Sequence, residues 1–182
     1  MRTHVVLLRG VNVGGHNRVP MADLRAIASA LGHTAVATYL NSGNLVLATD
    51  RTDTVALAAE FAAAIEARLG PRIEVVVLSR AQLGEVVAGN PCGEPADPKT
   101  LHAVLRQGPM PAERRAVIER EQERAAASGD VARVAGRTLY LLTPGGIGRS
   151  DLAARLGRGT DTGTARNWTT VMNLLALLDE VT

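Results

Sequence analysis

The sequence contains a single cysteine, few aromatic residues and no long hydrophobic run. Cys92 alone excludes an internal disulfide framework and a zinc site built from several thiolates. Aromatic residues make up 2% of the 182 residues, which disfavours RNA recognition on a sheet face, where bases stack on exposed aromatic side chains. No hydrophobic run approaches the roughly 20 residues that cross a bilayer, so no membrane association is expected.

Positive and negative charges are also nearly balanced. The formal net charge is only +2, so the isoelectric point of 9.2 reflects a small excess of arginine rather than a basic patch. Nucleic acid is therefore disfavoured as a partner. Arg2, His4 and Arg9 interrupt any apolar core near the start of the chain, so no secretory signal is expected and the cytoplasm is the expected compartment.

Lysine is nearly absent as well. Lys99 is the only lysine, and the other basic residues are arginines. An ammonium binds and titrates differently from a guanidinium. We therefore predict that Lys99 faces a cleft between the two halves of the chain and binds an anion there. Chance survival at a neutral surface position is the alternative.

Hydrophobic periodicity divides the first 80 residues into six expected elements. Leu57, Phe61 and Ile65, for example, recur every four residues, as on one face of a helix. The expected elements are a strand at 4–9, a helix from Pro20 to Gly32, strands at 35–40 and 45–48, a helix from Thr52 or Asp53 to Gly70, and a strand at 73–78. This βαββαβ order is typical of a ferredoxin-like fold.

The second half repeats most of this order. Ser79–Gln82 resembles a capping box that starts a short helix, and Asn90–Pro98, with three prolines, is the best linker candidate. The elements expected after the linker are a strand at 101–105, a helix at 111–127, a hairpin of strands at 130–134 and 137–142, a helix from Ser150, and a last helix from near Asn167.

These patterns predict an α+β protein of two ferredoxin-like units. The second unit is expected to be incomplete, because no clear last strand follows the helix at Ser150, and to carry an added C-terminal helix. The expected borders are 1–80 for the first unit, 81–98 for a helix and proline-rich linker, and 99–182 for the second unit.

The glycine-rich segment Leu7–Gly15 is the strongest functional signal. It follows a buried strand, leads into a helix, and with the residues after it carries Arg9, Asn12, His16, Asn17 and Arg18. Free backbone N–H groups and cations meet in such loops, which is how many anion sites are built.

The expected topology adds a second loop to this one. In a ferredoxin-like unit the first and second strands run parallel, so the loop after Arg9 and the turn Asn41–Asn44 lie at the same sheet edge. The residues predicted to bind a ligand there are Arg9, Asn12, Asn41, Ser42 and Asn44. The alternative is structural: the glycines serve turn geometry, and the asparagines hydrogen-bond their own backbone.

Several motifs, taken together, resemble a known family. LLRGVNVGG, VPMADLR, TYLNSGNLVL, KTLHAVL, GIGRSDL and TARNWTTV occur in order along the chain. They are similar to the uncharacterised bacterial family catalogued as domain of unknown function 1697. The resemblance implies a cytoplasmic α+β protein built from ferredoxin-like halves, and it implies no activity. It also supports as site residues Arg9, Asn12, Ser42, Asn44, Lys99, His102, Arg166, Asn167 and Trp168.

The remaining motifs favour structural roles. His102 has the chemistry of a general base, but a hydrogen-bonded structural histidine is the simpler interpretation. Gly145–Arg149 lacks the Walker pattern and is expected to be a helix-entry loop. The charged run Glu113–Arg124 indicates a solvated helix face. No carboxylate pair or histidine cluster has metal-ligand spacing, so neither a metal nor a cofactor is expected.

Three functions remain open at this point. The first is binding or turnover of a small anionic metabolite, including phosphorylated ones, at the edge formed by Arg9 and Asn41–Asn44. The second is a non-catalytic interaction or assembly module, because fold does not fix function. The third, and least favoured, is nucleic-acid binding on the sheet face. Whether the chain is an enzyme, and its oligomeric state, stay open.

Overall fold

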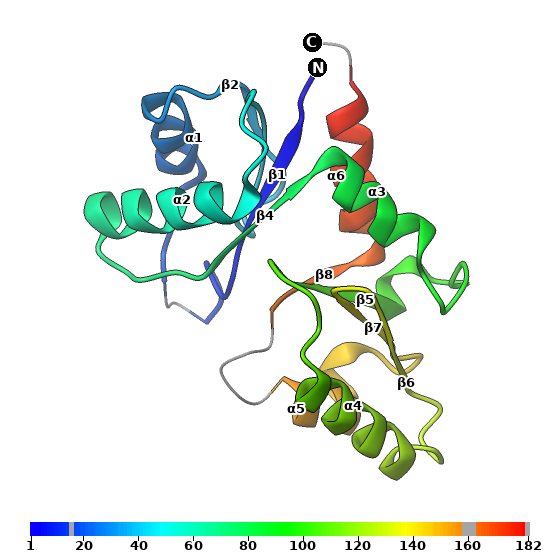
Figure 1. The fold of residues 1–182 in the computed structure, drawn as a ribbon. Helices are drawn as coiled ribbons and strands as arrows, with labels where there is room; N and C mark the ends of the chain where they lie inside the picture. Colours follow the sequence, from blue (N-terminus) through cyan, green and yellow to red (C-terminus); the bar gives the residue numbers. More distant parts are fainter. Residues whose placement is uncertain (15–16, 158–162, 181–182) are drawn as a thin grey trace. The chain divides into compact units, whose positions relative to one another are not determined.

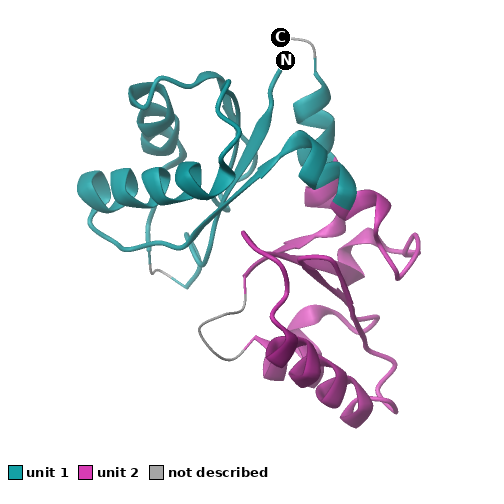
Figure 2. Cartoon of the chain, in the orientation of Figure 1, with its two compact units in different colours: residues 1–85, 173–182 teal, residues 86–172 magenta. Residues whose placement is uncertain are grey.

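The computed structural model describes residues 1–14, 17–157 and 163–180. In this part of the chain, six α helices accompany two four-stranded sheets whose neighbouring strands are all antiparallel (Figure 1). The chain divides into two compact units, which Figure 2 colours separately: residues 1–85 with 173–182, and residues 86–172. The α+β class expected from the sequence is confirmed.

Unit 1 is a four-stranded sheet with two helices from the strand connections. In chain order its elements are β1 (His4–Leu8), α1 (Met21–Ala30), β2 (Thr34–Thr38), β3 (Asn44–Ala48), α2 (Thr54–Leu69) and β4 (Val75–Ser79). The strands lie in the order β2-β3-β1-β4. β1 is central, and its five residues are all buried, which explains why its sequence HVVLL is an unbroken hydrophobic run.

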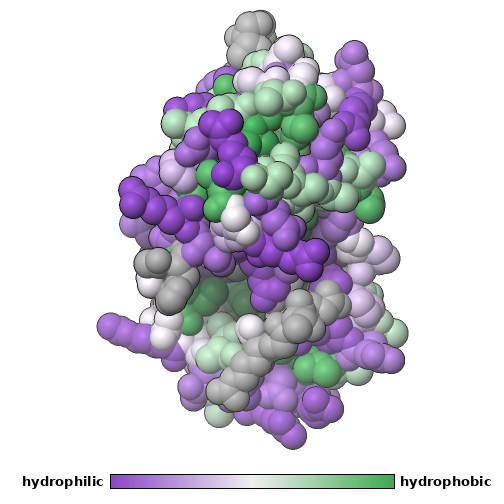
Figure 3. All heavy atoms as spheres, turned by 90° about the vertical axis from the view of Figure 1, so that its left-hand side faces the viewer, coloured by the Kyte–Doolittle hydropathy of each residue, from purple (hydrophilic) through white to green (hydrophobic). Residues whose placement is uncertain are grey.

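One core of unit 1 lies between the sheet and helices α1 and α2. Val6 and Leu8 of β1 pack there with Leu24 of α1 and Phe61 of α2, all fully buried. Leu57, Phe61 and Ile65 of α2 are buried, while Glu66 and Arg68 of the same helix are exposed, so α2 is amphipathic in the way that the sequence period predicted. Figure 3 shows the side of the molecule on the left of Figure 1, where hydrophilic and hydrophobic residues are interspersed.

The ends of α2 and the start of α3 (Arg80–Ala88) follow from capping chemistry. The Asp53 side chain accepts hydrogen bonds from the backbone N–H groups of the first turn of α2. At α3 the Ser79 Oγ accepts from the Gln82 backbone N–H at 3.2 Å, and the Gln82 Oε1 accepts from the Ser79 N–H at 3.0 Å. This reciprocal pair is the capping box expected from the sequence.

Removal of the Asp53 cap gives a first test of this local account. Asp53→Ala leaves two N–H groups of α2 without their acceptor, so the free energy of unfolding should fall by about 1 kcal/mol. Urea denaturation measures the change. Asp50→Ala, an exposed aspartate just outside the helix, is the control and should leave stability unchanged.

Unit 2 repeats the same order of elements. They are η1 (Pro98–Thr100), β5 (Leu101–Leu105), α4 (Ala112–Arg124), β6 (Val131–Ala135), β7 (Thr138–Leu142), η2 (Ile147–Arg149), α5 (Asp151–Leu156) and β8 (Thr164–Asn167), followed by α6 (Trp168–Asp179). The strands lie in the order β6-β7-β5-β8. One core lies between the sheet and helices α4 and α5, with Ile118, Leu139, Leu152 and Leu156 buried.

The prediction that the second unit lacks its last strand was wrong. Residues 164–167 form β8, which pairs antiparallel with β5. The strand has only four residues, and its sequence TARN carries none of the β-branched apolar residues that mark the other strands, apart from a threonine. Pairing with β5, rather than intrinsic propensity, makes it a strand.

The division between the two compact units falls inside helices, and the borders expected at 80 and 99 stay predictions. Helix α3 contains the division between Glu85 and Val86, and helix α6 contains the division between Met172 and Asn173. Each of these helices therefore contributes residues to both units. Within unit 1, Arg80 forms a bidentate ion pair with Asp179 of α6, with N–O distances of 2.6 and 3.0 Å.

Candidate functional site

The two loops expected to converge in unit 1 lie against each other. We call residues 9–14, 17–18 and 39–44 the loop cluster. The Asn12 Nδ2 donates to the Asn41 carbonyl at 2.7 Å and to the Val19 carbonyl at 2.9 Å, while its Oδ1 accepts from the Val19 N–H at 2.9 Å. The Asn12 side chain thus links the first loop to the Asn41–Asn44 turn and also links two parts of the first loop. Asn12 adopts a positive φ of 56°.

The turn is packed closely onto strand β1. The Leu8 N–H donates to the Gly43 carbonyl at 2.8 Å. A Cβ at Gly43, whose φ is 71°, would lie 2.7 Å from both Leu8 Cβ and Val11 Cγ2. The Asn44 side chain is fully buried, and its Nδ2 donates to the Tyr39 carbonyl at 3.0 Å. Gly43, Asn44 and Asn12 therefore hold the loop cluster together.

Arg9 lies at the edge of the loop cluster, in an ion pair that the sequence did not reveal. Its Nη1 is 2.8 Å from Glu74 Oε2, and both side chains are partly exposed, at 31% and 47%. The Arg9 N–H also donates to the Glu74 carbonyl at 3.0 Å. Ser42, Asn41 and Arg18 are exposed on the same cluster. Gly15 and His16 lie outside the described residues.

The other predicted site residues belong to unit 2. His102 of β5 is the register partner of Asn167 of β8, so these two residues are brought together. The Asn167 Oδ1 accepts from the Thr170 N–H at 2.8 Å, so Asn167 caps α6. Burial lowers the pKa of His102, and its buried Nδ1 has no hydrogen-bond partner among the described residues. A neutral imidazole is therefore favoured at pH 7.

Arg166 is one of the buried charged residues in the described part of the chain. It is the register partner of Ala103, which in turn pairs with Tyr140, so the three share one face of the sheet. Its Nη1 donates to the Thr164 Oγ1 at 2.7 Å and to the Ala165 carbonyl at 2.8 Å. Burial lowers the pKa of Arg166 to about 10, so the guanidinium stays charged at pH 7 and holds the β8 backbone.

Lys99 and Trp168 occupy different environments within unit 2. Lys99 is exposed in η1, where its backbone N–H donates to Asp97 Oδ1 at 2.9 Å. The cleft proposed for it stays a prediction. Trp168 is 1% exposed and tilted against Tyr140, with ring centroids 6.3 Å apart. It is therefore a core residue of unit 2, and it is not available for stacking on a ligand from solvent.

Two buried histidines form an additional titratable cluster in unit 1. His33 stacks on Phe61, with ring centroids 5.4 Å apart and ring planes 13° from parallel. His4 Nδ1 and Thr3 Oγ1 share a hydrogen bond of 2.9 Å. Burial lowers the pKa of both, and each is affected by nearby charges: His33 lowers that of His4, while Glu60 raises and Arg51 lowers that of His33.

The lowered pKa values predict loss of stability in mild acid. Below about pH 6.5 the histidines of the unfolded chain bind protons that the native histidines do not bind. The free energy of unfolding should therefore fall as the pH drops from 7.5 to 5.5. Urea denaturation at several pH values measures this fall. It should be smaller in His33→Gln, and an equal fall in that variant would assign the pH dependence to other groups.

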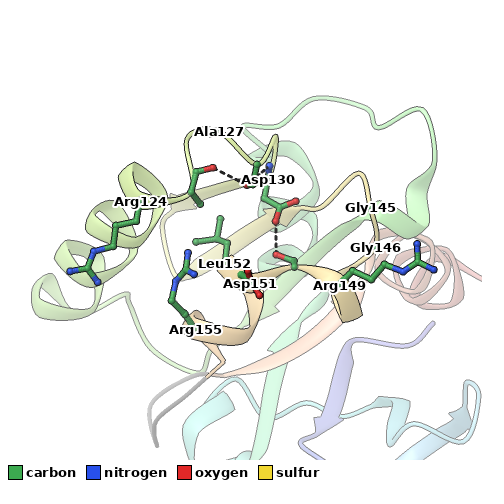
Figure 4. A pocket seen from close by; sticks show the side chains of 12 residues that line it. Arg124, Ala127, Asp130, Gly145, Gly146, Arg149, Asp151, Leu152 and Arg155 are labelled. Carbon is green, nitrogen blue, oxygen red and sulfur yellow. Dashed lines mark hydrogen bonds between the residues drawn. The ribbon is translucent and has the colours of Figure 1, made fainter.

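A polar pocket of about 470 Å³ lies in unit 2 (Figure 4). The end of α4 and the following turn, the loop after β7, η2 and α5 line it. The charged lining residues are Arg124, Asp130, Arg149, Asp151 and Arg155. Ser150 Oγ donates to Asp130 Oδ2 at 2.7 Å and accepts from the Ala153 N–H at 2.9 Å. Sequence reasoning missed this pocket, because its residues are spread over four segments.

Residues 1–14, 17–157 and 163–180 contain neither a metal-ion cluster nor a membrane-spanning helix. No group of three histidine, cysteine, aspartate or glutamate side chains with the geometry to hold a metal ion was found there. None of the helices in those ranges has the length and hydrophobicity to cross a membrane.

The paired sheets and the loop cluster define an α+β protein with polar candidate sites in both units. Residues 1–140 match the family model described as a protein of unknown function (DUF1697), so the chain belongs to that family. This confirms the resemblance found in the motifs. A search of curated proteins gave no match.

The chain is also similar to a solved structure, that of a conserved bacterial protein from Streptococcus pneumoniae. The TM-score is 0.72 and the sequence identity 21%, over 98% of this chain and 99% of that chain. At this identity the likeness concerns the fold alone, and it extends over both units.

Proposed function

We propose that this protein binds a small anionic ligand, of the carboxylate or phosphate class, at the loop cluster of unit 1 in the cytoplasm. The observation that carries the proposal is the Asn12 amide, which ties the two loops together at 2.7 Å. A loop that is ordered before binding loses less entropy when a ligand arrives. Arg9, Asn41 and Ser42 are then held at one edge of the sheet, ready to contact oxygen atoms.

The ion pair of Arg9 with Glu74 is compatible with this role. Exposed ion pairs contribute little to stability, with a median near 0–1 kcal/mol. A phosphate or carboxylate that offers two oxygens to the guanidinium forms a stronger, charge-assisted contact. Glu74 therefore orients Arg9 in the free protein without competing strongly with a ligand.

The residues of the loop cluster divide into two groups in this proposal. Asn12 and Asn44 are engaged with backbone groups, so we assign them the structural role that the sequence left open. Arg9, Asn41 and Ser42 contact the ligand. We also infer that both units are ferredoxin-like, which the strand orders β2-β3-β1-β4 and β6-β7-β5-β8 support.

A thermal-shift screen with Arg9→Ala tests the proposal. A set of carboxylates and phosphates, including inorganic phosphate and pyrophosphate, should contain a compound that raises the Tm of the wild type by mass action. Loss of a charged hydrogen-bond partner weakens binding by about 1.5–3 kcal/mol, so Arg9→Ala should lose the rise.

The matched control is Arg68→Ala. Arg68 is also a partly exposed arginine of unit 1, paired with Asp23 at 3.0 Å, and its variant should keep the full rise in Tm. Equal loss in both variants would show a nonspecific charge effect. An Arg9→Ala protein that is folded and keeps the full rise would contradict the role of Arg9.

Two exposed hydrophobic residues support a second candidate, an interaction module. Val13 and Leu40 are 70% and 57% exposed on the loop cluster, and Leu40 has a positive φ of 57°. Strained, exposed apolar residues are typical of binding surfaces. If no anion raises the Tm, and if the protein self-associates in a way that Leu40→Ser abolishes, the interaction role replaces the proposed one.

A further inference from the structure

The pocket of unit 2 is a binding site of a different kind from the loop cluster. Its volume of about 470 Å³ falls within the range of pockets that hold small ligands. Figure 4 shows Arg155 on one side, Arg149 on the other, and Asp130 and Asp151 between them. Cations and anions therefore line the same pocket.

Glu121 fixes the arginine side of this pocket. Its side chain is only 9% exposed, and its two carboxylate oxygens accept from Arg124 Nη1 and Arg155 Nε, both at 2.8 Å. The prediction that Glu113–Arg124 is simply a solvated helix face is therefore wrong at Glu121. Arg120 Nε also lies 3.8 Å from Glu121 Oε1, so three guanidinium groups surround this buried carboxylate. The two short hydrogen bonds hold Arg124 and Arg155 in place.

This arrangement keeps Arg155 away from its natural neighbour on the helix. Asp151 and Arg155 are four residues apart in α5, a spacing that commonly gives an ion pair. No such pair forms, since Glu121 takes the Nε edge of Arg155. Asp151 is exposed and Arg155 is half-buried. Among the described residues, no other group hydrogen-bonds to the Asp151 carboxylate or to the two Nη groups of Arg155, whose Nε is engaged by Glu121. A free anion and a free cationic edge thus line one pocket.

We infer that this pocket binds a small zwitterion of the amino-acid class, with its carboxylate on the Nη edge of Arg155 and its ammonium on Asp151. The lining favours this ligand over a simple anion, because Asp151 and Arg155 line the same pocket and the Asp151 carboxylate would repel an anion held by Arg155. A zwitterion satisfies both free groups, and the space that remains accommodates a side chain. The inference is independent of the loop cluster.

The test follows backbone amide signals of ¹⁵N-labelled full-length protein in titrations with each of the twenty L-amino acids, and with acetate and methylammonium. At least one amino acid should give saturable shifts at Ser128, Gly146 and Asp151–Arg155, at concentrations where acetate and methylammonium give none. Asp151→Asn should weaken that binding at least tenfold, since the ammonium loses a charged acceptor. Asp50→Asn, an exposed aspartate of unit 1, should bind with unchanged affinity.

Three outcomes would overturn the inference. Acetate that binds as tightly as the best amino acid would reduce the pocket to an anion site. Equal affinity in Asp151→Asn would remove the ammonium subsite. Absence of saturable shifts with all twenty amino acids at 20 mM (roughly the upper end of weak ligand binding) would remove the site. Arg155→Gln keeps the ion pair between Arg124 and Glu121. This variant should lose amino-acid binding while its amide spectrum stays that of a folded protein.

Discussion

Replacing Phe61 by alanine should lower the free energy of unfolding by about 3–5 kcal/mol, the range found for large aromatic residues removed from a core. Phe61 is fully buried in the core between the sheet and α2, and its ring stacks on His33. The variant therefore loses the buried area and leaves a cavity beside the imidazole. Urea denaturation at pH 7.5 measures the loss.

Val55→Ala is the control for this prediction. Val55 lies on the same helix but is 62% exposed, so its substitution should change stability by no more than about 0.5 kcal/mol. Water entering the cavity of Phe61→Ala also relieves the desolvation of His33, so the loss of stability below pH 6.5 should become shallower. If Phe61→Ala lowers the free energy of unfolding by less than about 1 kcal/mol, the packing described for unit 1 is contradicted.

Gly43→Ala should be the second large effect, with a loss of about 2–6 kcal/mol in the free energy of unfolding. The new Cβ would lie 2.7 Å from atoms of Leu8 and Val11, and overpacking of this kind costs roughly 1–3 kcal/mol. A positive φ at a non-glycine residue adds about 1–3 kcal/mol of backbone strain. Thermal or urea unfolding measures the sum.

Gly10→Ala separates these two contributions. Gly10 has a similar φ of 61°, but a Cβ there meets no atom within 4 Å. Gly10→Ala should therefore lose stability through backbone strain alone, and its free energy of unfolding should be clearly higher than that of Gly43→Ala. Equal losses in the two variants would mean that the turn is not packed onto β1 as described.

Much of the fold was predictable because local chemistry and tertiary packing agree. The Asp53 cap, the capping box at Ser79 and the hydrophobic run of β1 each specify their element from nearby residues. β8 was not predictable, because Thr164–Asn167 become a strand only through pairing with β5. Helix α6 also looked like an appendage of the second half, whereas its later residues group with unit 1.

The candidate site was predictable in position and less so in detail. Strand topology alone indicated that the Arg9 loop and the Asn41–Asn44 turn converge. The pairing of Arg9 with Glu74 comes from the neighbouring β4 edge, 65 residues along the chain, and no local pattern encodes it. Glu121 was misread for a similar reason, since a charged helix face gives no sign that one of its carboxylates is buried.

The central claim, an anion site at the loop cluster, is tested most directly by titrating ¹⁵N-labelled protein with pyrophosphate and following the backbone amide signals. The account predicts saturable shifts concentrated at Arg9, Gly10 and Asn41–Asn44, absent in Arg9→Gln and intact in Arg68→Gln. Shifts that are spread over arginines of both units, or that persist unchanged in Arg9→Gln, would contradict it.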